Sequence, residues 1–253
     1  MPSVLTVFII AYNSEKKIEA CLKSVQWADE IIVVDSFSSD RTAELSRELG
    51  ARVYNREFKN YADQKNYALS LVQTPWALSL DSDEAVSEPL KEEILRALAS
   101  NPEAAAYRIP RESFIFGRKF RFTGTQDDAP VRLLRAGRAR FEQPVHEVVK
   151  VEGATGKLSN PIFHFTYDSV EDYLSRLNRY TSLEAAYLKS KNTPLSWRDY
   201  FLRPSAVFFR LYILKQGFRD GMEGFFFSAF SAFYTLIKYA KYRELGKNGH
   251  AAA

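Results

Sequence analysis

The sequence of 253 residues is poor in cysteine and histidine, with one cysteine, Cys21, and three histidines. A lone cysteine excludes an internal disulfide bond and a zinc site built from cysteine thiolates. No basic stretch precedes the apolar residues 4–10, and no small-residue cleavage site follows them, so no secretory signal peptide is predicted. We therefore expect a reduced, cytoplasmic setting.

Long hydrophobic runs and two common nucleotide-binding fingerprints are also missing. The uncharged run 224–237 has 14 residues, whereas a helix needs about 20 to cross a bilayer. Neither the glycine-rich Rossmann fingerprint nor the Walker P-loop is present, which argues against a dinucleotide dehydrogenase and a P-loop ATPase. A hydrophobic share of 46% with 26% charged residues excludes disorder as the main state.

The first hundred residues alternate between apolar strand-like runs and helical segments. Such alternation predicts parallel β-α-β units, in which ligands bind beyond the carboxyl ends of the strands. The expected strands are 4–10, 30–35, 52–55 and 76–80, and the expected helices are 16–24, 41–49, 61–71 and 87–99.

The pattern changes after residue 102. Four strands without intervening helices are expected at 104–109, 131–134, 145–151 and 162–165, with turns at Gly117, Gly124, Gly137, Gly153 and Gly156. Three helices are expected at 169–189, 195–214 and 221–242. We therefore predict an α/β fold with a mixed sheet flanked by helices, a catalytic domain over 1–168, and a C-terminal helical region over 169–253.

An apolar strand runs directly into three carboxylates, Asp81, Asp83 and Glu84. Residues two apart on an extended backbone point to the same side, so Asp81 and Asp83 can converge on one cation, or one can hold a metal while the other holds a sugar hydroxyl. Carboxylate oxygens suit Mg²⁺ or Mn²⁺. The alternative is a solvated loop whose side chains cap the next helix.

Two further strands end in polar residues. Asp35 closes the second strand, and Ala11, Tyr12 and Asn13 close the first. Asp40 is expected to be the N-cap of the following helix. Polar residues at the ends of three strands predict a nucleotide-binding cleft.

The ordered segments VFIIAYNSEKKIEACLKSV, EIIVVDSFSSDRT, YADQKNYAL and LSLDSDEAV resemble the family 2 glycosyltransferases of GT-A fold. Further segments are similar to the branch of lipopolysaccharide core glycosyltransferases of the WaaE/KdtX type: AYRIPRESFIFG, residues 128–135, 144–147, 164–167 and LNRYT. The resemblance runs from about residue 4 to 242. It implies a GT-A-like, Rossmann-like mixed sheet.

The resemblance also implies roles for particular residues. The expected donor-binding residues are Ala11, Tyr12, Asn13, Asp35, Lys65 and Asp81. Asp35 would lie near the base, Lys65 would approach the diphosphate or position the carboxylates, and Asp81 would contact ribose or sugar. Lys65 has the alternative of being a solvated helix residue.

Metal, base and acceptor candidates follow from the same resemblance. Asp83 would coordinate the divalent cation, and His164 would be an additional contact to the metal or to phosphate. Asp128 would act as the general base. Secondary candidates near the acceptor are Asp127, Arg132 and Glu147. The alternatives are a structural His164, an Arg132 on the solvent side of its strand, and an edge-strand position for Glu147.

The function implied is inverting, metal-dependent transfer of a sugar from a nucleotide-sugar, with a UDP-sugar favoured. The acceptor would be a saccharide or glycolipid, such as lipopolysaccharide core. Two alternatives stay open: a non-catalytic module that binds sugar nucleotides or membranes, and a two-carboxylate glycoside hydrolase.

The C-terminal region is basic and aromatic. Residues 201–243 contain seven Lys or Arg, two Asp or Glu, and 13 of the chain's 36 aromatic residues. One interpretation is binding to an anionic membrane surface on the inner face of the cytoplasmic membrane. The alternative is that these helices cover the core or a second copy, which leaves a homo-oligomer open. Nucleic acid is not expected as a partner, because no binding motif accompanies the charge.

Overall fold

The computed structural model describes residues 4–100, 103–143 and 148–248. The chain forms two compact units. The first consists of Met1–Arg111 and Asp128–His164, and the second of Glu112–Asp127 and Phe165–Ala253. The predicted functional division after residue 168 stays a prediction.

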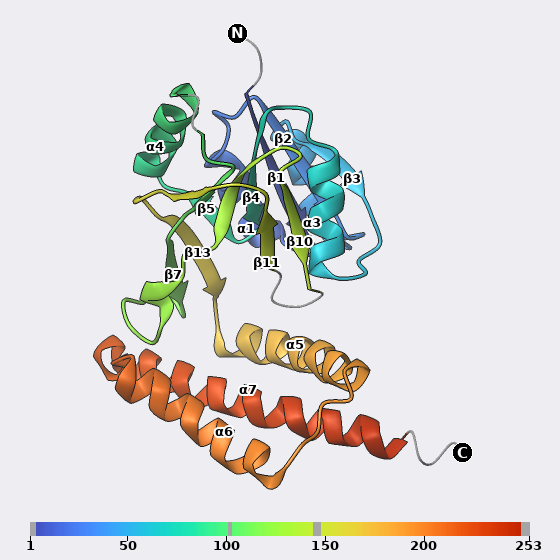
Figure 1. Cartoon of the computed structure of the whole chain (residues 1–253), viewed down its shortest axis with the longest axis vertical. Coiled ribbons are helices and arrows are strands. Elements are labelled where there is room, and N and C mark those ends of the chain that lie inside the picture. Colours follow the sequence, from blue (N-terminus) through green and yellow to red (C-terminus); the bar gives the residue numbers. More distant parts are fainter. Residues whose placement is uncertain (1–3, 101–102, 144–147, 249–253) are drawn as a thin grey trace. The chain divides into compact units, whose positions relative to one another are not determined.

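A mixed seven-stranded sheet forms the centre of the first unit (Figure 1). In spatial order its strands are β12 (Thr155–Lys157), β6 (Ala106–Arg108), β9 (Val131–Arg135), β4 (Trp76–Asp81), β1 (Leu5–Ala11), β2 (Glu30–Asp35) and β3 (Arg52–Asn55). Strand β1 is parallel to β2 and β4, and β2 is parallel to β3. Strand β9 is antiparallel to both of its neighbours. The predicted α/β fold with a mixed sheet is confirmed.

Both faces of the sheet are covered, and this explains why β1 is buried at every position. Leu5, Val7 and Ile9 belong to a core shared with α1 (Glu15–Lys23) and α4 (Glu88–Ala99), and α2 (Thr42–Glu48) packs beside it. Phe8 and Ile10 belong to a second core with α3 (Tyr61–Ser70) and the hairpin β10–β11 (Ala139–Glu142 and Val148–Val151). Each buried methylene contributes about 0.8 kcal/mol, so the uninterrupted apolar run of β1 stabilises a central position.

Polar side chains fix where the helices begin. Ser87 accepts a hydrogen bond from the amide of Leu90 at 3.4 Å, which confirms the predicted cap of α4. The prediction for Asp40 is wrong by one residue, because Arg41 is the N-cap of α2. The Asp40 carboxylate instead accepts from the amides of Thr42, at 3.0 Å, and Glu15, at 3.1 Å. Asp40 therefore ties the beginnings of α1 and α2 together.

Several short strands after β4 were not predicted. They include β5 (Glu84–Val86), β7 (Arg111–Ile115) and β8 (Arg118–Lys119), besides β10 and β12. Strand β5 pairs with the first half of β13 (Ile162–Tyr167). Gly156, expected in a turn, lies inside β12, where an added Cβ would stand 2.6 Å from the Tyr107 ring. Glycine is needed there for close approach to a neighbouring side chain.

The second unit is mainly helical. It contains η1 (Thr125–Asp127), α5 (Val170–Ser190), α6 (Trp197–Phe209), η2 (Arg210–Leu214), η3 (Gly217–Asp220) and α7 (Gly221–Asn248), with α7 packed against α5 and α6. The three predicted helices are confirmed, although 195–214 divides into α6 and the π-helical η2. In the described ranges, no helix combines the length and apolar character that a membrane crossing requires.

Candidate functional site

The loops after β1 and β2 are joined by hydrogen bonds at the carboxyl edge of the sheet. Asn13 adopts a positive φ of 47°, its amide donates to Ser38 Oγ at 2.9 Å, and its Oδ1 accepts from the Ser39 amide at 2.8 Å. Ala11 is buried beside this loop, and Tyr12 is exposed. These hydrogen bonds hold the two loops together. Ala11, Tyr12 and Asn13, which were predicted to bind the sugar donor, therefore lie at the carboxyl edge of the sheet beside the loop that follows β2.

Asp35 lies at the end of β2 and is buried. Its carboxylate accepts from the Ser38 amide at 2.8 Å and from Ser38 Oγ at 2.5 Å. Between them, Phe37 has a positive φ of 58°, and its side chain is 62% exposed. A bulky residue in this conformation is strained. Phe37 was not singled out in the sequence, and the only available signal was an aromatic residue among serines.

Asp81 ends β4 and is held by two cations. Its Oδ1 lies 2.9 Å from Lys65 Nζ, and its Oδ2 lies 2.6 Å from Arg132 Nη2. The Lys65 side chain is 2% exposed, so the alternative of a solvated helix residue is wrong. Burial opposes ionisation of Asp81, but Arg132 and Lys65 outweigh it and hold the pKa of that carboxyl well below its ordinary value.

The charges continue inward from Asp81 as an alternating ionic chain. Arg132 Nη2 also lies 2.6 Å from Glu84 Oε1, which in turn lies 3.2 Å from Arg111 Nη1. Arg111 donates to Asp128 Oδ2 from Nε, at 2.8 Å, and from Nη2. Burial works against the charge of Arg111, yet Glu84 and Asp128 raise its pKa. Lys65, Asp81, Arg132, Glu84, Arg111 and Asp128 are thus linked in that order.

The ionic chain revises one prediction and adds two residues to the site. Arg132 is buried, so its alternative position on the solvent side of β9 is wrong. Glu84 and Arg111 were not predicted as site residues. Glu84 is adjacent in sequence to the two aspartates, but nothing in the sequence indicates that Arg111 and Arg132 lie on either side of it.

Asp83 lies in a turn, not on an extended strand. Residues 82 and 83 form a turn between β4 and β5, so the expected same-side geometry of Asp81 and Asp83 does not apply. Asp83 Oδ1 lies 3.6 Å from His164 Nε2, and Ser82 Oγ lies 2.8 Å from Ser14 Oγ. The turn therefore brings together the two residues predicted to bind a metal.

These two residues fit a divalent cation in part. Within 4–100, 103–143 and 148–248, no three His, Cys, Asp or Glu side chains are grouped as a metal site. A carboxylate oxygen and an imidazole nitrogen are nonetheless suitable donors for Mn²⁺. Mg²⁺ and Mn²⁺ commonly complete their coordination with substrate phosphates and water, so two protein donors are a reasonable set.

Two candidates are not brought into this group. Asp127 belongs to the second unit, where its Oδ2 lies 2.6 Å from Lys215 Nζ. Glu147 lies outside the described residues. Asp128, by contrast, belongs to the first unit with Arg111.

Comparison with known proteins bears on the same part of the chain. The model of the family described as Glycosyl transferase family 2 matches residues 6–147. A relative from Rhizobium meliloti (strain 1021), "Lipopolysaccharide core biosynthesis glycosyltransferase LpsC", is 29% identical over 94% of this chain and 91% of its own length. An "Uncharacterized glycosyltransferase" from Rickettsia felis is also 29% identical, over 95% of this chain and 89% of that protein.

Solved structures share the fold. Residues 1–349 of S. aureus TarS superpose with a TM-score of 0.50 at 16% identity, covering 99% of this chain and 92% of that one. Mannosyl-3-phosphoglycerate synthase from Rubrobacter xylanophilus gives 0.50 at 14% identity, covering 78% and 77%. The predicted GT-A-like fold is confirmed, and the resemblance found in the sequence is confirmed with it. The chain belongs to glycosyl transferase family 2 and is a glycosyltransferase.

Proposed function

We propose that this glycosyltransferase transfers a sugar, with inversion, from a nucleotide-sugar to a saccharide acceptor on a lipid-linked glycan such as lipopolysaccharide core. A UDP-sugar is the favoured donor, and Mn²⁺ or Mg²⁺ the proposed cofactor. The name of the relative from Rhizobium meliloti supports the acceptor class. The observation that carries the proposal is the union of three strand ends, β1, β2 and β4, by the hydrogen bonds of Asn13 and Ser14.

The donor would lie across these strand ends. We assign the base and ribose to the edge formed by Tyr12, Asn13 and Asp35, with exposed Phe37 as an added surface for stacking. Lys65 and Arg132 keep Asp81 ionised, so that it can accept hydrogen bonds from hydroxyl groups of ribose or sugar.

Asp83 and His164 would hold the cation, which supplies positive charge against the leaving diphosphate. Their spacing of 3.6 Å leaves both side chains within reach of one ion. Because the turn at 82–83 is hydrogen-bonded to Ser14, Asp83 is positioned before a ligand arrives.

Asp128 would take the proton of the acceptor hydroxyl. Arg111 donates two hydrogen bonds to Asp128 Oδ2, and in the described part of the chain no hydrogen bond reaches Asp128 Oδ1. The carboxylate is about one-third exposed, so Oδ1 can serve as the base while Arg111 fixes its direction. Attack opposite the leaving diphosphate inverts the anomeric centre. For Arg132, burial favours a role in positioning Asp81, and its contact with the acceptor stays a prediction.

The second unit would place the enzyme at an anionic membrane surface on the cytoplasmic side. Its basic residues and exposed apolar side chains support this assignment. A lipid-linked acceptor would then be presented at the same surface. Whether two copies associate stays open.

A thermal-shift panel tests the donor and cation assignments together. Nucleoside diphosphates are added with and without Mn²⁺, and one of them should raise the melting temperature only with the cation. Asp83→Asn should abolish the cation-dependent part, whereas Glu57→Gln, on an exposed loop, should leave it intact. A flat panel, or a shift unchanged by Asp83→Asn, would contradict the proposed site.

A further inference from the structure

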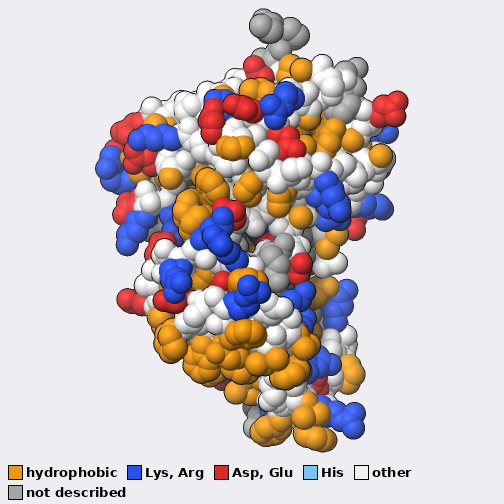
Figure 2. Space-filling view, turned by 90° about the vertical axis from the view of Figure 1, so that its left-hand side faces the viewer, with side chains coloured by type: hydrophobic (Ala, Val, Ile, Leu, Met, Phe, Trp, Pro, Cys, Tyr) orange, Lys and Arg blue, Asp and Glu red, His pale blue; other side chains and the backbone are white. Residues whose placement is uncertain are grey.

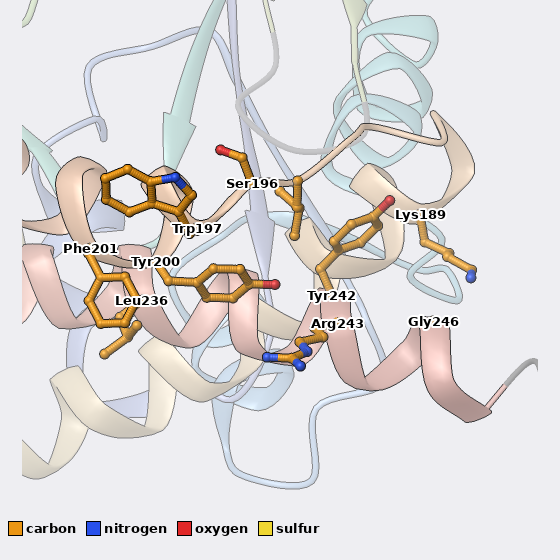
Figure 3. A pocket seen from close by; sticks show the side chains of 10 residues that line it. Lys189, Ser196, Trp197, Tyr200, Phe201, Leu236, Tyr242, Arg243 and Gly246 are labelled. Atoms are coloured by element: carbon orange, nitrogen blue, oxygen red, sulfur yellow. The ribbon is translucent and has the colours of Figure 1, made fainter.

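The helical unit contains a cavity of about 710 Å³ with an apolar wall. Trp197, Tyr200 and Phe201 line it from α6, and Leu236 and Tyr242 line it from α7 (Figure 3). Trp197 is 62% exposed and Phe201 is 67% exposed. The volume lies within the range of pockets that bind small molecules, and apolar, aromatic walls are typical of them.

The charged residues at this cavity are all cationic. Lys189 and Arg243 belong to its lining, and none of the lining residues is acidic. Within the described chain, neither side chain has an ion-pair partner. The cavity therefore suits a ligand that combines an apolar part with an anionic group.

Contacts within the chain hold the wall on α6 in place. The Asp199 carboxylate accepts from the Ser196 amide at 2.6 Å, and its Oδ1 lies 2.7 Å from Arg203 Nε. The amide hydrogen bond lowers the pKa of Asp199, so this contact is ionic at neutral pH. Tyr242 is fixed in turn by its hydroxyl, which donates to the Thr193 carbonyl at 2.7 Å. A preformed wall reduces the entropic cost of binding.

The surroundings of the cavity favour a lipid over a second copy of the chain. Most of the exposed large hydrophobic side chains in the described residues belong to this unit, and Figure 2 shows hydrophobic side chains gathered over it. Residues 201–243 carry seven basic and two acidic residues, so two such surfaces would repel each other. Tyrosine and tryptophan are also enriched where an apolar environment meets water.

We propose that this cavity binds an acyl chain of an anionic membrane lipid, with Lys189 and Arg243 facing the headgroup. The inference deepens the proposed function and rests on its lipid-linked acceptor, since it gives that acceptor's membrane a specific binding site. The inference is more specific than binding of the second unit to a membrane surface, because it assigns one lipid molecule to one cavity.

Dioctanoylphosphatidylglycerol, kept below its critical micelle concentration, is the probe. The signal is the emission of Trp197, obtained as the difference between the wild-type protein and Trp197→Phe, since Trp27 and Trp76 are common to both. The proposal predicts a saturable blue shift with one lipid bound per chain. Dioctanoylphosphatidylcholine should bind more weakly, and Arg243→Gln should remove that preference.

Phe201→Ser should weaken lipid binding about tenfold or more, as for truncation of a central contact residue. Phe201 is so exposed that this substitution should leave the fold intact, which an unchanged melting temperature verifies. Leu214→Ser is the matched control, since Leu214 is 64% exposed in η2 and does not line the cavity. Its affinity should equal that of the wild type.

Three results would overturn the proposal: a signal that does not saturate, equal effects of Phe201→Ser and Leu214→Ser, or equal binding of the two lipids. The measurement needs neither sugar donor nor acceptor. Its failure would leave the proposed transfer reaction standing, and failure of the reaction would leave lipid binding standing.

Discussion

Replacing Arg132 with methionine tests the ionic chain at a buried cation that contacts two carboxylates. The substitution keeps a long apolar stem but removes the guanidinium that lies 2.6 Å from both Asp81 and Glu84. Asp81 then keeps Lys65, at 2.9 Å, and Glu84 keeps Arg111, at 3.2 Å. Glu84 should lose more stabilisation than Asp81, because its side chain is fully buried and its remaining cation is more distant.

Removing one partner of a buried ion pair costs about 3–5 kcal/mol, because the other charge stays buried without compensation. Since each carboxylate retains one cation, we expect the lower end, about 3 kcal/mol. For a chain of this length that lowers the melting temperature by about 6–12 °C. The measurement is thermal unfolding followed by tryptophan fluorescence, to which Trp76 contributes from the buried start of β4.

The matched control is Arg140→Met, at a surface pair. Arg140 is 74% exposed and lies 3.6 Å from Glu142, so its loss should cost less than about 1 kcal/mol. The double variant Arg132→Met, Glu84→Gln should recover part of the stability, since the uncompensated charge is gone. If Arg132→Met destabilises the chain no more than Arg140→Met does, the ionic chain is not a stabilising unit and the reasoning is refuted.

Three further outcomes are expected. The pKa of Asp81 is depressed in the folded state, so its contribution to the free energy of unfolding is present above the unfolded pKa of about 3.9 and is lost as pH falls below that value. Melting temperatures measured between pH 2.5 and 5 should therefore depend less steeply on pH in Asp81→Asn than in the wild type. The control variant Glu57→Gln should keep the wild-type pH dependence. Asp128→Asn should lower kcat by about 10²–10⁴-fold while keeping the donor-induced thermal shift, and an unchanged kcat would remove it as the base. Gly156→Ala should cost about 1–3 kcal/mol in urea unfolding because its Cβ would meet the facing tyrosine ring, whereas Gly246→Ala, with open space in α7, should be neutral or stabilising.

The repeating half of the fold was predictable because its signals are local. The strands β1, β2 and β4 are short apolar runs that end in polar residues, and helices separate them. The short strands β5, β8 and β12 have two or three residues each, which is too few for a periodic pattern. Strands β5 and β12 form because β13 and β6, which are distant in sequence, provide hydrogen bonds. Strand β8 forms a short hairpin with the neighbouring β7.

The candidate site could be proposed from the sequence only where its residues lie at strand ends. Asp35 and Asp81 stand out because each ends a buried strand, Asp83 stands out because it lies two residues beyond Asp81, and the ends of parallel strands meet at one edge. The ionic chain did not stand out, since Arg111 and Arg132 are two arginines among many charged residues. Their role depends on their position beside buried Glu84. That position arises only when β4 pairs with β9 and the chain turns from β4 into β5.

Arg111 and Asp128 are the residues at which the backbone leaves the first unit and re-enters it. They are joined by their side chains and by a hydrogen bond from the Arg111 amide to the Asp128 carbonyl, at 2.8 Å. The pair therefore holds together the two ends of a segment of sixteen residues, 112–127, and its contacts offset the loss of chain entropy that this closure requires. We therefore expect insertions or cleavage within 112–127 to change the orientation of the Asp128 carboxylate, and with it the proton removal proposed for this residue.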